Sequence, residues 1–297
     1  GRHAEVPVVL RFLVAPLALA ACVTTAPPPH RLGRPARADA HLAVSWIGHA
    51  TMLVQIDDRF VLTDPVLVDT IAGGVSHRKV GVPVDPRDLP PIDAVLISHM
   101  HFDHLSLDSL EKIEPLVRRA YLPEGGLVYL TNFRFDAVDL ARWETFDDRG
   151  MRITAVPVKH LGGRYTMDTW MHAFSGYVVR YHGVTVYFAG DTAYAKDDFR
   201  EAARRFGPID LALLPIAPIH PRSVMESVHM DPAEALDALE DLGARRMIPM
   251  HFDTFVDSFD APHEARDTFV RLVHARHLDS RVTLLDVGEE ITLSKRK

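Results

Sequence analysis

Three imidazoles and a carboxylate stand within six consecutive residues, His99-Met100-His101-Phe102-Asp103-His104. Imidazole nitrogens and carboxylate oxygens are the usual ligands of a catalytic zinc ion or a similar divalent ion. The hexad directly follows the apolar run 94–98, which predicts a short loop at the end of a buried strand. The chain has 17 histidines, so one histidine is weak evidence, but four candidate ligands in this setting indicate a metal site.

Other ligand-type residues follow apolar runs elsewhere in the chain or precede a predicted helix. They are Asp64, His160, Asp191, His229 and His251. Side chains at strand ends are held by rigid elements and converge on one edge of a sheet, which suits a preorganised site. Each residue alone has a purely structural explanation, such as a turn aspartate or a buried histidine. The complete set favours metal ligation.

The spacing inside the hexad predicts that one segment serves two metal sites. His99 and His101 are two residues apart and can point to the same side of an extended loop. Asp103 and His104 lie at the predicted start of a helix and can face a different direction. His160 would complete the first site, together with His99 and His101.

The second site would combine Asp103 and His104 with His251. Asp191 carries two carboxylate oxygens and can bridge both sites. Two ions about 3.5–4 Å apart can share a hydroxide and stabilise the attacking and leaving oxygens of a hydrolysis. Binuclear hydrolytic chemistry is therefore expected.

The elements that would position these residues alternate between short strands and helices. Strands are predicted at 41–47, 51–56, 59–63, 94–98, 151–156, 175–180, 184–189, 211–214, 247–249, 281–286 and 290–293, and helices at 106–113, 197–206, 231–242 and 262–277. Ser106 and Asp231 are suitable N-caps, and Pro232 suits the first helical turn. Strand-rich halves with interspersed helices predict an α/β fold, a four-layer αββα sandwich.

The first 38 residues differ in composition from the rest. The apolar stretch 12–22 is too short to span a bilayer as a helix and fits the core of a secretory signal peptide. Leu19-Ala20-Ala21-Cys22 resembles a bacterial lipoprotein processing box, so residues 1–22 are expected to be a lipoprotein-type signal peptide, with an ordinary signal peptide as the alternative. Residues 23–38 include Pro27-Pro28-Pro29 and are expected to form a flexible or extended linker before the body, 39–297.

Composition excludes several classes of function. The net charge of -7 provides no basic field that would favour nucleic acid. Cys22 is the single cysteine, so an intrachain disulfide and a CxxC zinc site are excluded. The hydrophobic content of 47% and charged content of 25% are typical of a globular protein with a sizeable core.

The ordered set of candidate ligands resembles the metallo-β-lactamase superfamily, whose pattern is HxHxDH followed by a histidine, an aspartate and a final histidine. Over most of residues 42–260 the chain is more closely similar to N-acyl-phosphatidylethanolamine-hydrolysing phospholipase D and its bacterial relatives. The stretches that carry this likeness are Trp46-Ile47-Gly48-His49-Ala50-Thr51, Leu62-Thr63-Asp64-Pro65, Phe188-Ala189-Gly190-Asp191-Thr192, Pro221-Arg222, Met225 and His229-Met230-Asp231-Pro232-Ala233-Glu234-Ala235.

This resemblance implies roles for individual residues. The implied zinc ligands are His99, His101, Asp103, His104, His160, Asp191 and His251. His229 is implied to lie near the substrate phosphate or leaving group, Asp64 to orient a ligand histidine, and His49 to lie close to the site. The segment 161–165 and Ser223-Val224 depart from the animal pattern, which leaves the lipid groove and the substrate open.

The implied activity is that of a zinc-dependent hydrolase with two ions per chain, zinc or another divalent metal. The preferred substrate is a phosphodiester such as N-acyl-phosphatidylethanolamine, attacked by a hydroxide that bridges the metals. Asp103 or Asp191 would steer the hydroxide, and His229 would stabilise developing charge or protonate the leaving oxygen. Asp103, Asp191 and His229 are thus the candidate catalytic residues.

Two other functions stay open on the sequence alone. One is a lactonase or sugar-phosphate hydrolase on the same fold, and the other is a non-catalytic, membrane-tethered, metal-binding lipoprotein. The expected partners are a lipid or small-molecule substrate, the membrane of a bacterial cell envelope through lipidated Cys22, and a second copy in a homodimer. No nucleic-acid partner is expected.

Overall fold

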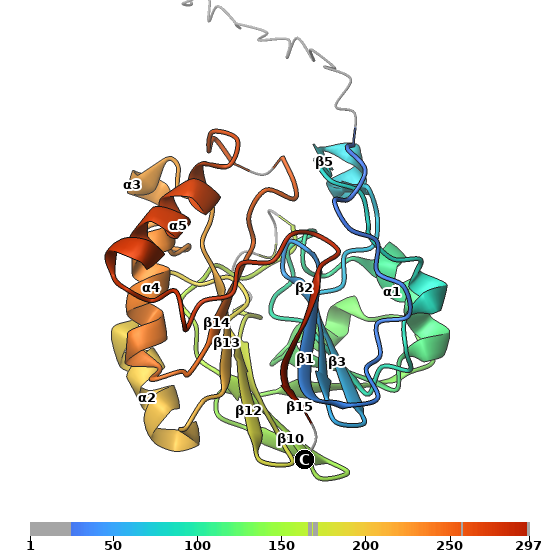
Figure 1. Ribbon diagram of the computed structural model, residues 1–297. Coiled ribbons are helices and arrows are strands. Elements are labelled where there is room, and N and C mark those ends of the chain that lie inside the picture. Colours follow the sequence, from blue (N-terminus) through green and yellow to red (C-terminus); the bar gives the residue numbers. More distant parts are fainter. Residues whose placement is uncertain (1–24, 166–167, 169–171, 257, 296–297) are drawn as a thin grey trace, which may run out of the picture.

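Two β-sheets face each other in the computed structural model, which describes residues 25–165, 168, 172–256 and 258–295 (Figure 1). The first sheet has the order β15 (Glu290–Lys295), β1 (Ala40–Gly48), β2 (Thr51–Ile56), β3 (Arg59–Thr63), β6 (Ala94–Leu96), β7 (Arg119–Pro123) and β8 (Asp136–Leu140). The second has the order β14 (Met247–Met250), β13 (Leu211–Pro215), β12 (Val184–Phe188), β11 (Gly176–Tyr181), β10 (Met151–Val156) and β9 (Thr145–Asp148).

Helices cover the outer face of each sheet. The five described α-helices are α1 (Leu107–Ile113), α2 (Lys196–Phe206), α3 (Arg222–Met225), α4 (Pro232–Asp241) and α5 (Glu264–Ala275). In Figure 1, α1 lies outside the first sheet, whereas α2, α4 and α5 lie outside the second. A small hairpin of β4 (Thr70–Ile71) and β5 (Ser76–His77) stands at one end of the molecule. The predicted αββα sandwich is confirmed.

The strand that precedes the hexad is buried on both of its faces. Leu96 of β6 packs into the core between the two sheets, where it joins Val54. Its neighbours Val95 and Ile97 point to the other side and pack with Leu110 beneath α1. This two-sided burial explains the continuous apolar run 94–98, which does not alternate as a half-exposed strand would.

Two helices begin where the sequence predicts. Ser106 caps α1 and accepts a hydrogen bond from the backbone nitrogen of Ser109. Asp231 caps α4, with Pro232 in the first turn, and Glu234 completes a capping box by accepting from the Asp231 nitrogen. Because these caps satisfy backbone donors that would otherwise lack partners, they define the helix starts sharply.

Some sequence predictions are wrong. Residues 281–286 form no strand, and only Val282 makes an isolated bridge, to Met247. Leu285 of this run is buried in the inter-sheet core, so the run is apolar because of packing rather than sheet pairing. Three strands were not predicted, the interior strand β7 and the edge strands β8 and β9. Charged residues interrupt the periodicity of β8 and β9.

The described part of the proline-rich segment, residues 25–38, runs along the body rather than away from it. The Ala26 nitrogen donates to Lys79 O at 2.8 Å, and the Leu32 nitrogen donates to Pro83 O at 3.0 Å. The expected signal peptide, including Cys22, falls outside the described residues. Within those residues, no helix combines the length and hydrophobicity needed to cross a membrane.

Candidate metal centre

The candidate ligands stand at one edge of the sandwich, on segments that leave both sheets. The hexad follows β6 of the first sheet, and His160, Asp191 and His251 follow β10, β12 and β14 of the second. Strands β12, β13 and β14 pair in parallel, so Asp191 and His251 leave the sheet at the same edge. The structure therefore brings together residues that are up to 152 positions apart in the sequence.

His99, His101 and His160 form one compact group. The Nε2 atom of His99 lies 2.9 Å from Nδ1 of His101, which in turn lies 3.4 Å from Nε2 of His160. Metal–nitrogen bonds of 2.0–2.1 Å place neighbouring ligands of a tetrahedral zinc ion about 3.4 Å apart. This trio accordingly matches one face of a tetrahedral metal site, as the sequence predicts.

Asp103, His104 and His251 form the second group. The Nε2 atoms of His104 and His251 are 3.2 Å apart, and Asp103 Oδ2 lies 3.5 Å and 3.7 Å from them, respectively. These separations also agree with the ligand spacing around a tetrahedral ion, about 3.4 Å. The structure places the hexad residues in two groups as expected, and their division between two metal ions stays a prediction.

Asp191 lies between the two groups. Its Oδ2 atom is 3.2 Å from His104 Nε2 and 3.1 Å from His251 Nε2, and it is 3.9 Å from His99 Nε2. Gly190 before it has a φ of 59° and faces Ser98, whose Cβ would lie 2.3 Å from any added Cβ. Only glycine allows this close approach and positive φ together, so Gly190 sets the direction of Asp191.

The hexad enters the site through a turn rather than through a helix. Residues 102–104 form a turn closed by the His104 nitrogen, which donates to His101 O at 3.1 Å, and α1 begins only at Leu107. The expectation that Asp103 and His104 lie at a helix start is therefore wrong. From this turn, Asp103 and His104 reach the second group, although the ring centroid of His104 stays 4.1 Å from that of His99.

Asp64 holds two residues of the hexad region in place. Its Oδ2 lies 2.6 Å from His104 Nδ1 and accepts from Ser98 Oγ at 2.6 Å, while Oδ1 accepts from the Ser98 nitrogen at 2.7 Å. Ser98 Oγ also lies 2.9 Å from Nδ1 of His99. A carboxylate bound to one ring nitrogen fixes the tautomer and orientation of a histidine whose other nitrogen faces a metal.

His49 contacts the site from the turn between β1 and β2. Its Nε2 atom lies 3.0 Å from Asp103 Oδ2, and its carbonyl accepts a hydrogen bond from the His251 nitrogen at 3.1 Å. Both His49 and His251 have positive φ, 56° and 62°. Non-glycine residues rarely adopt this conformation, and the hydrogen bonds between the two segments hold both histidines in it.

His229 faces the same space from the segment before α4. Its Nδ1 atom is buried, lies 3.8 Å from Asp191 Oδ2 and has no hydrogen-bond partner among the described residues. The ring centroid is 5.1 Å from that of His160. His229 thus stands beside the ligand groups, with a ring nitrogen available to another molecule.

Three residues hold parts of the site and were not assigned roles from the sequence. Arg222 donates to His229 O at 3.0 Å and pairs with Glu234 of the α4 capping box. Thr254 accepts a hydrogen bond from the His49 nitrogen at 2.7 Å. Ser98 bridges Asp64 and His99, as described above. A role for Arg222 could have been predicted, because Pro221-Arg222 belongs to the pattern shared with the phospholipase D relatives. The local sequence around Thr254 does not predict its contact with His49.

Burial keeps several of these imidazoles neutral. It lowers the pKa of His160 to about 3 and that of His229 to about 4, and it lowers the pKa of His99 well below its usual range. Burial also disfavours charge on His104 and His251, but the nearby carboxylates, Asp191 foremost, outweigh it. They raise the pKa of His251 to about 10 and that of His104 well above its usual value.

These observations fit a divalent metal. Neutral imidazoles present lone pairs for coordination, and the carboxylates around His104 and His251 stabilise positive charge at the position of the second group. Asp191 Oδ1 is buried and has no hydrogen-bond partner among the described residues. Ring nitrogens and carboxylate oxygens, with no thiolate, are typical of hydrolytic zinc and related centres.

The family model described as Beta-lactamase superfamily domain matches residues 59–252 of this chain. The chain belongs to the metallo-β-lactamase superfamily. It is 31% identical over 271 residues to N-acyl-phosphatidylethanolamine-hydrolyzing phospholipase D 1 of Caenorhabditis elegans, covering 84% of this chain and 76% of that protein. As a member of this superfamily, the present chain is a metal-dependent hydrolase.

Other superfamily proteins are similar over much of the chain. A mitochondrial N-acyl-phosphatidylethanolamine-hydrolyzing phospholipase D of Saccharomyces cerevisiae is 33% identical, over 71% of this chain but only 47% of the yeast protein. A metal-dependent hydrolase of Exiguobacterium is 32% identical over 71% of this chain and 86% of its own length. A metallo hydrolase from the archaeon Ignicoccus hospitalis shares the fold, with a TM-score of 0.64 and 22% identity over 85% of this chain and 98% of that one.

Proposed function

We propose that this protein is a zinc-dependent phosphodiesterase that binds two ions and hydrolyses a lipid phosphodiester of the N-acyl-phosphatidylethanolamine type. The names of the worm and yeast relatives support this reaction class. The seven candidate ligands would be divided into the two groups described above, with Asp191 shared between them. Members of the superfamily differ in substrate, so the choice of a lipid is argued from the side chains around the metal centre.

An apolar rim around the metal centre carries the choice of a lipid. The rim consists of exposed hydrophobic side chains on segments that adjoin the site: Val75, Leu161, Tyr165, Val224, Val256 and Phe259. Leu161 directly follows His160, and Val256 lies five residues after His251. Phe259 is 86% exposed and Val75 is 83% exposed. Large apolar side chains gathered at the mouth of a polar site favour a substrate with acyl chains beside its reacting group.

The β4–β5 hairpin belongs to the same rim. Ser76 Oγ donates to Val256 O at 2.8 Å, and the Val256 nitrogen donates to His77 O at 3.0 Å. These bonds join the hairpin to the segment that follows His251. The hairpin and the Val256 segment are therefore joined parts of the rim, and a sugar phosphate, which has no acyl chain, would make little use of it.

Bound ions would polarise a phosphoryl oxygen and lower the pKa of water toward about 7, which provides a nucleophile at neutral pH. The protein contributes orientation. Asp64 orients the ring of His104, and His49 orients the carboxylate of Asp103. Asp191 contacts His104 on one side and faces the His99 group on the other. His229 would donate a hydrogen bond to a phosphoryl or leaving oxygen, because its ring faces the site with a nitrogen unused by the protein.

A substrate panel tests the proposal. The full chain, loaded with zinc, would be assayed on N-acyl-phosphatidylethanolamine, phosphatidylcholine, an N-acyl homoserine lactone and a sugar phosphate. The expected result is phosphatidic acid and N-acylethanolamine from the first substrate at the highest kcat/KM. Turnover of the lactone or the sugar phosphate with no hydrolysis of either phospholipid would overturn the choice of substrate and favour the corresponding alternative.

Asp191→Asn tests the metal arrangement in the same assay. Loss of the shared carboxylate should reduce bound zinc and abolish turnover, because both groups would lose a ligand. Asp147→Asn is the matched control, since Asp147 lies at an exposed position of β9, where it pairs with Arg152 and accepts from the Gly150 nitrogen. Metal analysis and activity would be measured for both variants. Full activity of Asp191→Asn would contradict the mechanism.

A further inference from the structure

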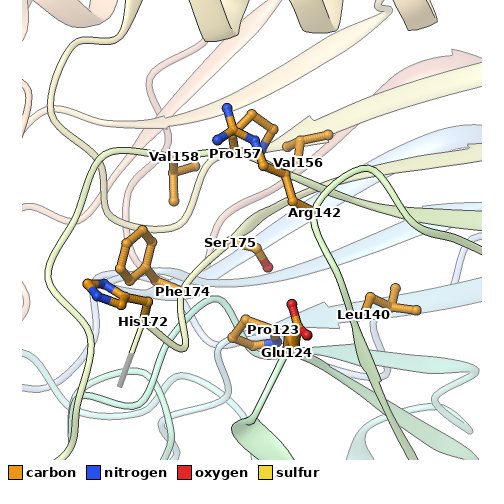
Figure 2. A pocket seen from close by; sticks show the side chains of 10 residues that line it. All are labelled: Pro123, Glu124, Leu140, Arg142, Val156, Pro157, Val158, His172, Phe174 and Ser175. Carbon is orange, nitrogen blue, oxygen red and sulfur yellow. The ribbon is translucent and has the colours of Figure 1, made fainter. Parts of the chain in front are cut away.

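A cavity of about 280 Å³ lies beside the metal centre, and none of the candidate ligands lines it (Figure 2). Its walls come from the ends of β7, β8 and β10 and from the segment before β11. Parallel strands β6, β7 and β8 end at this same edge of the first sheet. The carboxyl ends of parallel strands commonly form ligand sites, because chains diverge there and leave space.

One wall of this cavity is bonded to the strand end that carries His99. Phe174 pairs with His99 in an isolated antiparallel bridge, and the Ser175 nitrogen donates to Ser98 O at 2.8 Å. Val158, on another wall, lies two residues before His160. A ligand in the cavity would therefore touch the backbone that positions two members of the first ligand group.

The interior of the cavity is apolar. Leu140, Val156 and Val158 are buried, and the ring of Phe174 borders the same space (Figure 2). The volume lies just below the range of roughly 300–1,000 Å³ that small-molecule sites occupy. These walls suit a compact apolar or aromatic group rather than a long chain or a sugar.

One charged side chain of the cavity, the carboxylate of Glu124, has no ion pair among the described residues. Arg142 at the rim is paired with Asp198, at 2.8 Å, so its charge is compensated. Glu124 is the carboxylate that lines the cavity, and no ion pair joins it to any residue that the structure describes. An exposed carboxylate beside an aromatic ring favours an organic cation, which gains both an ion pair and a cation–π contact.

Ser175 adds a polar atom inside the cavity. The residue is 6% exposed, and its Oγ makes no hydrogen bond of ordinary geometry with any residue that the structure describes. Its neighbour Tyr177 donates instead to Ile97 O, at 2.8 Å. In Figure 2 the hydroxyl points into the cavity. A buried hydroxyl without a protein partner costs free energy unless a ligand or water satisfies it.

We propose that this cavity binds a small organic ammonium, whose charged nitrogen contacts Glu124 and Ser175 and whose apolar body packs against Leu140, Val158 and Phe174. The site is separate from the metal centre, and the proposal does not depend on the phosphodiesterase assignment. It adds to the hydrolase a binding site through which an amine would influence the His99 segment.

Calorimetry with 2-phenylethylammonium tests the site on the full, zinc-loaded chain. We expect saturable binding of one molecule per chain that weakens at least tenfold in Glu124→Gln and about threefold in Ser175→Ala. The neutral isostere 2-phenylethanol should bind the unaltered protein at least tenfold more weakly than the ammonium. Glu111→Gln, an exposed position on α1 outside the cavity, is the matched control and should bind the ammonium normally.

Three outcomes would overturn the proposal. Equal binding to Glu124→Gln and to the unaltered protein would show that the carboxylate is not the recognition element. Loss of ammonium binding in Asp191→Asn, with Glu124 intact, would place the amine on the metal rather than in the cavity. Absence of saturable binding to the unaltered protein would equally reject the site. Unchanged binding in Asp191→Asn supports it.

Discussion

At the scale of single residues, the carboxylate of Asp64 has the clearest supporting role. It is fully buried, and it binds His104 Nδ1 and both polar atoms of Ser98, so both of its oxygens are used. His104 Nε2 is thereby directed toward Asp191 and His251. The contact joins residues 40 positions apart, from the end of β3 to the turn after β6.

Replacing Asp64 by Asn should weaken metal binding by about 10- to 100-fold, because an amide cannot hold His104 in the tautomer and basicity that coordination requires. Competition with a chromogenic chelator would measure the change. Asp93→Asn is the control, since Asp93 lies at the other end of β6 and accepts from Arg59 and the Phe60 nitrogen. Equal zinc affinity of the Asp64 variant and the unaltered protein would contradict the role.

At the scale of elements, the start of α4 fixes the position of His229. Glu234 accepts from the Asp231 nitrogen within the capping box and also pairs with Arg222, whose other guanidinium nitrogen donates to His229 O at 3.0 Å. The Met230 nitrogen donates to Thr192 O at 2.8 Å, directly after Asp191. The helix cap therefore ties the His229 segment to the segment that carries the shared carboxylate.

Arg222→Ala should lower kcat by about 10- to 100-fold through displacement of His229, with bound zinc unchanged. The comparison of kcat with KM on the preferred substrate is the measurement, and Arg222→Lys should recover part of the loss. Arg276→Ala serves as control. Arg276, at the end of α5, pairs with Asp237 of α4, away from the site. A parallel loss of zinc and kcat would show that Arg222 acts on the fold instead.

A buried ionic cluster joins β9, at the edge of the second sheet, to β7 of the first. Asp148, at the end of β9 in the second sheet, accepts from Arg118, Arg119 and Tyr121 on or beside β7 of the first. Burial would raise the pKa of Asp148, but hydrogen bonds from Arg118 and Tyr121 and the arginine charges outweigh it. The pKa of this carboxyl is consequently held below its usual value.

Asp148→Asn should cost about 2 kcal/mol of unfolding free energy at pH 7, because it removes the buried carboxylate that two partly buried arginines share. A lowered pKa in the folded state stabilises the protein above the unfolded pKa of about 3.9, and this contribution fades as the pH falls below that value. The difference between variant and unaltered protein in urea unfolding should therefore shrink below about pH 4.

Asp136→Asn is the matched control for the ionic cluster. Asp136 pairs with Arg119 as well, at 2.9 Å, but its side chain is 69% exposed. Exposed pairs contribute about 0–1 kcal/mol. A loss in Asp136→Asn as large as that in Asp148→Asn, or a difference for Asp148→Asn that does not vary with pH, would show that the buried cluster does not join the sheets as described.

At the scale of the whole molecule, the metal centre connects the two halves of the sandwich. The hexad comes from the first sheet, whereas His160, Asp191 and His251 come from the second. Ions held by both sets of residues would bind the folded state and not the unfolded chain, in which these residues are far apart. We therefore expect metal binding to be coupled to the packing of sheet on sheet.

Removal of metal by a chelator should lower the thermal stability. An ion present at about 100 times its Kd contributes about 2.7 kcal/mol, so loss of two ions should lower Tm by on the order of 10 °C. Calorimetric scans before and after chelation, and after zinc is restored, would measure the effect. An unchanged Tm in protein shown to be free of metal would contradict a centre that spans both sheets.

Much of the site was predictable because its ligands are local features. The hexad follows a continuous apolar run, and that run is continuous because β6 is buried on both faces. The cap at Asp231 and the start of α1 were predictable for the same reason, since capping depends on neighbouring residues. Strand β9 was not predictable, because its Asp148 is satisfied by arginines about 30 positions away.

The sequence by itself determined which residue types were available as ligands, their order, and their places at the ends of strands. Tertiary structure decided which nitrogen meets which oxygen: Asp191 Oδ2 between His104 and His251, Asp64 on His104, and His49 on Asp103. It also placed Glu124 and Ser175 on one cavity. Propensity and capping act over a few residues, whereas these contacts join segments from two sheets and exist only once the sheets have packed.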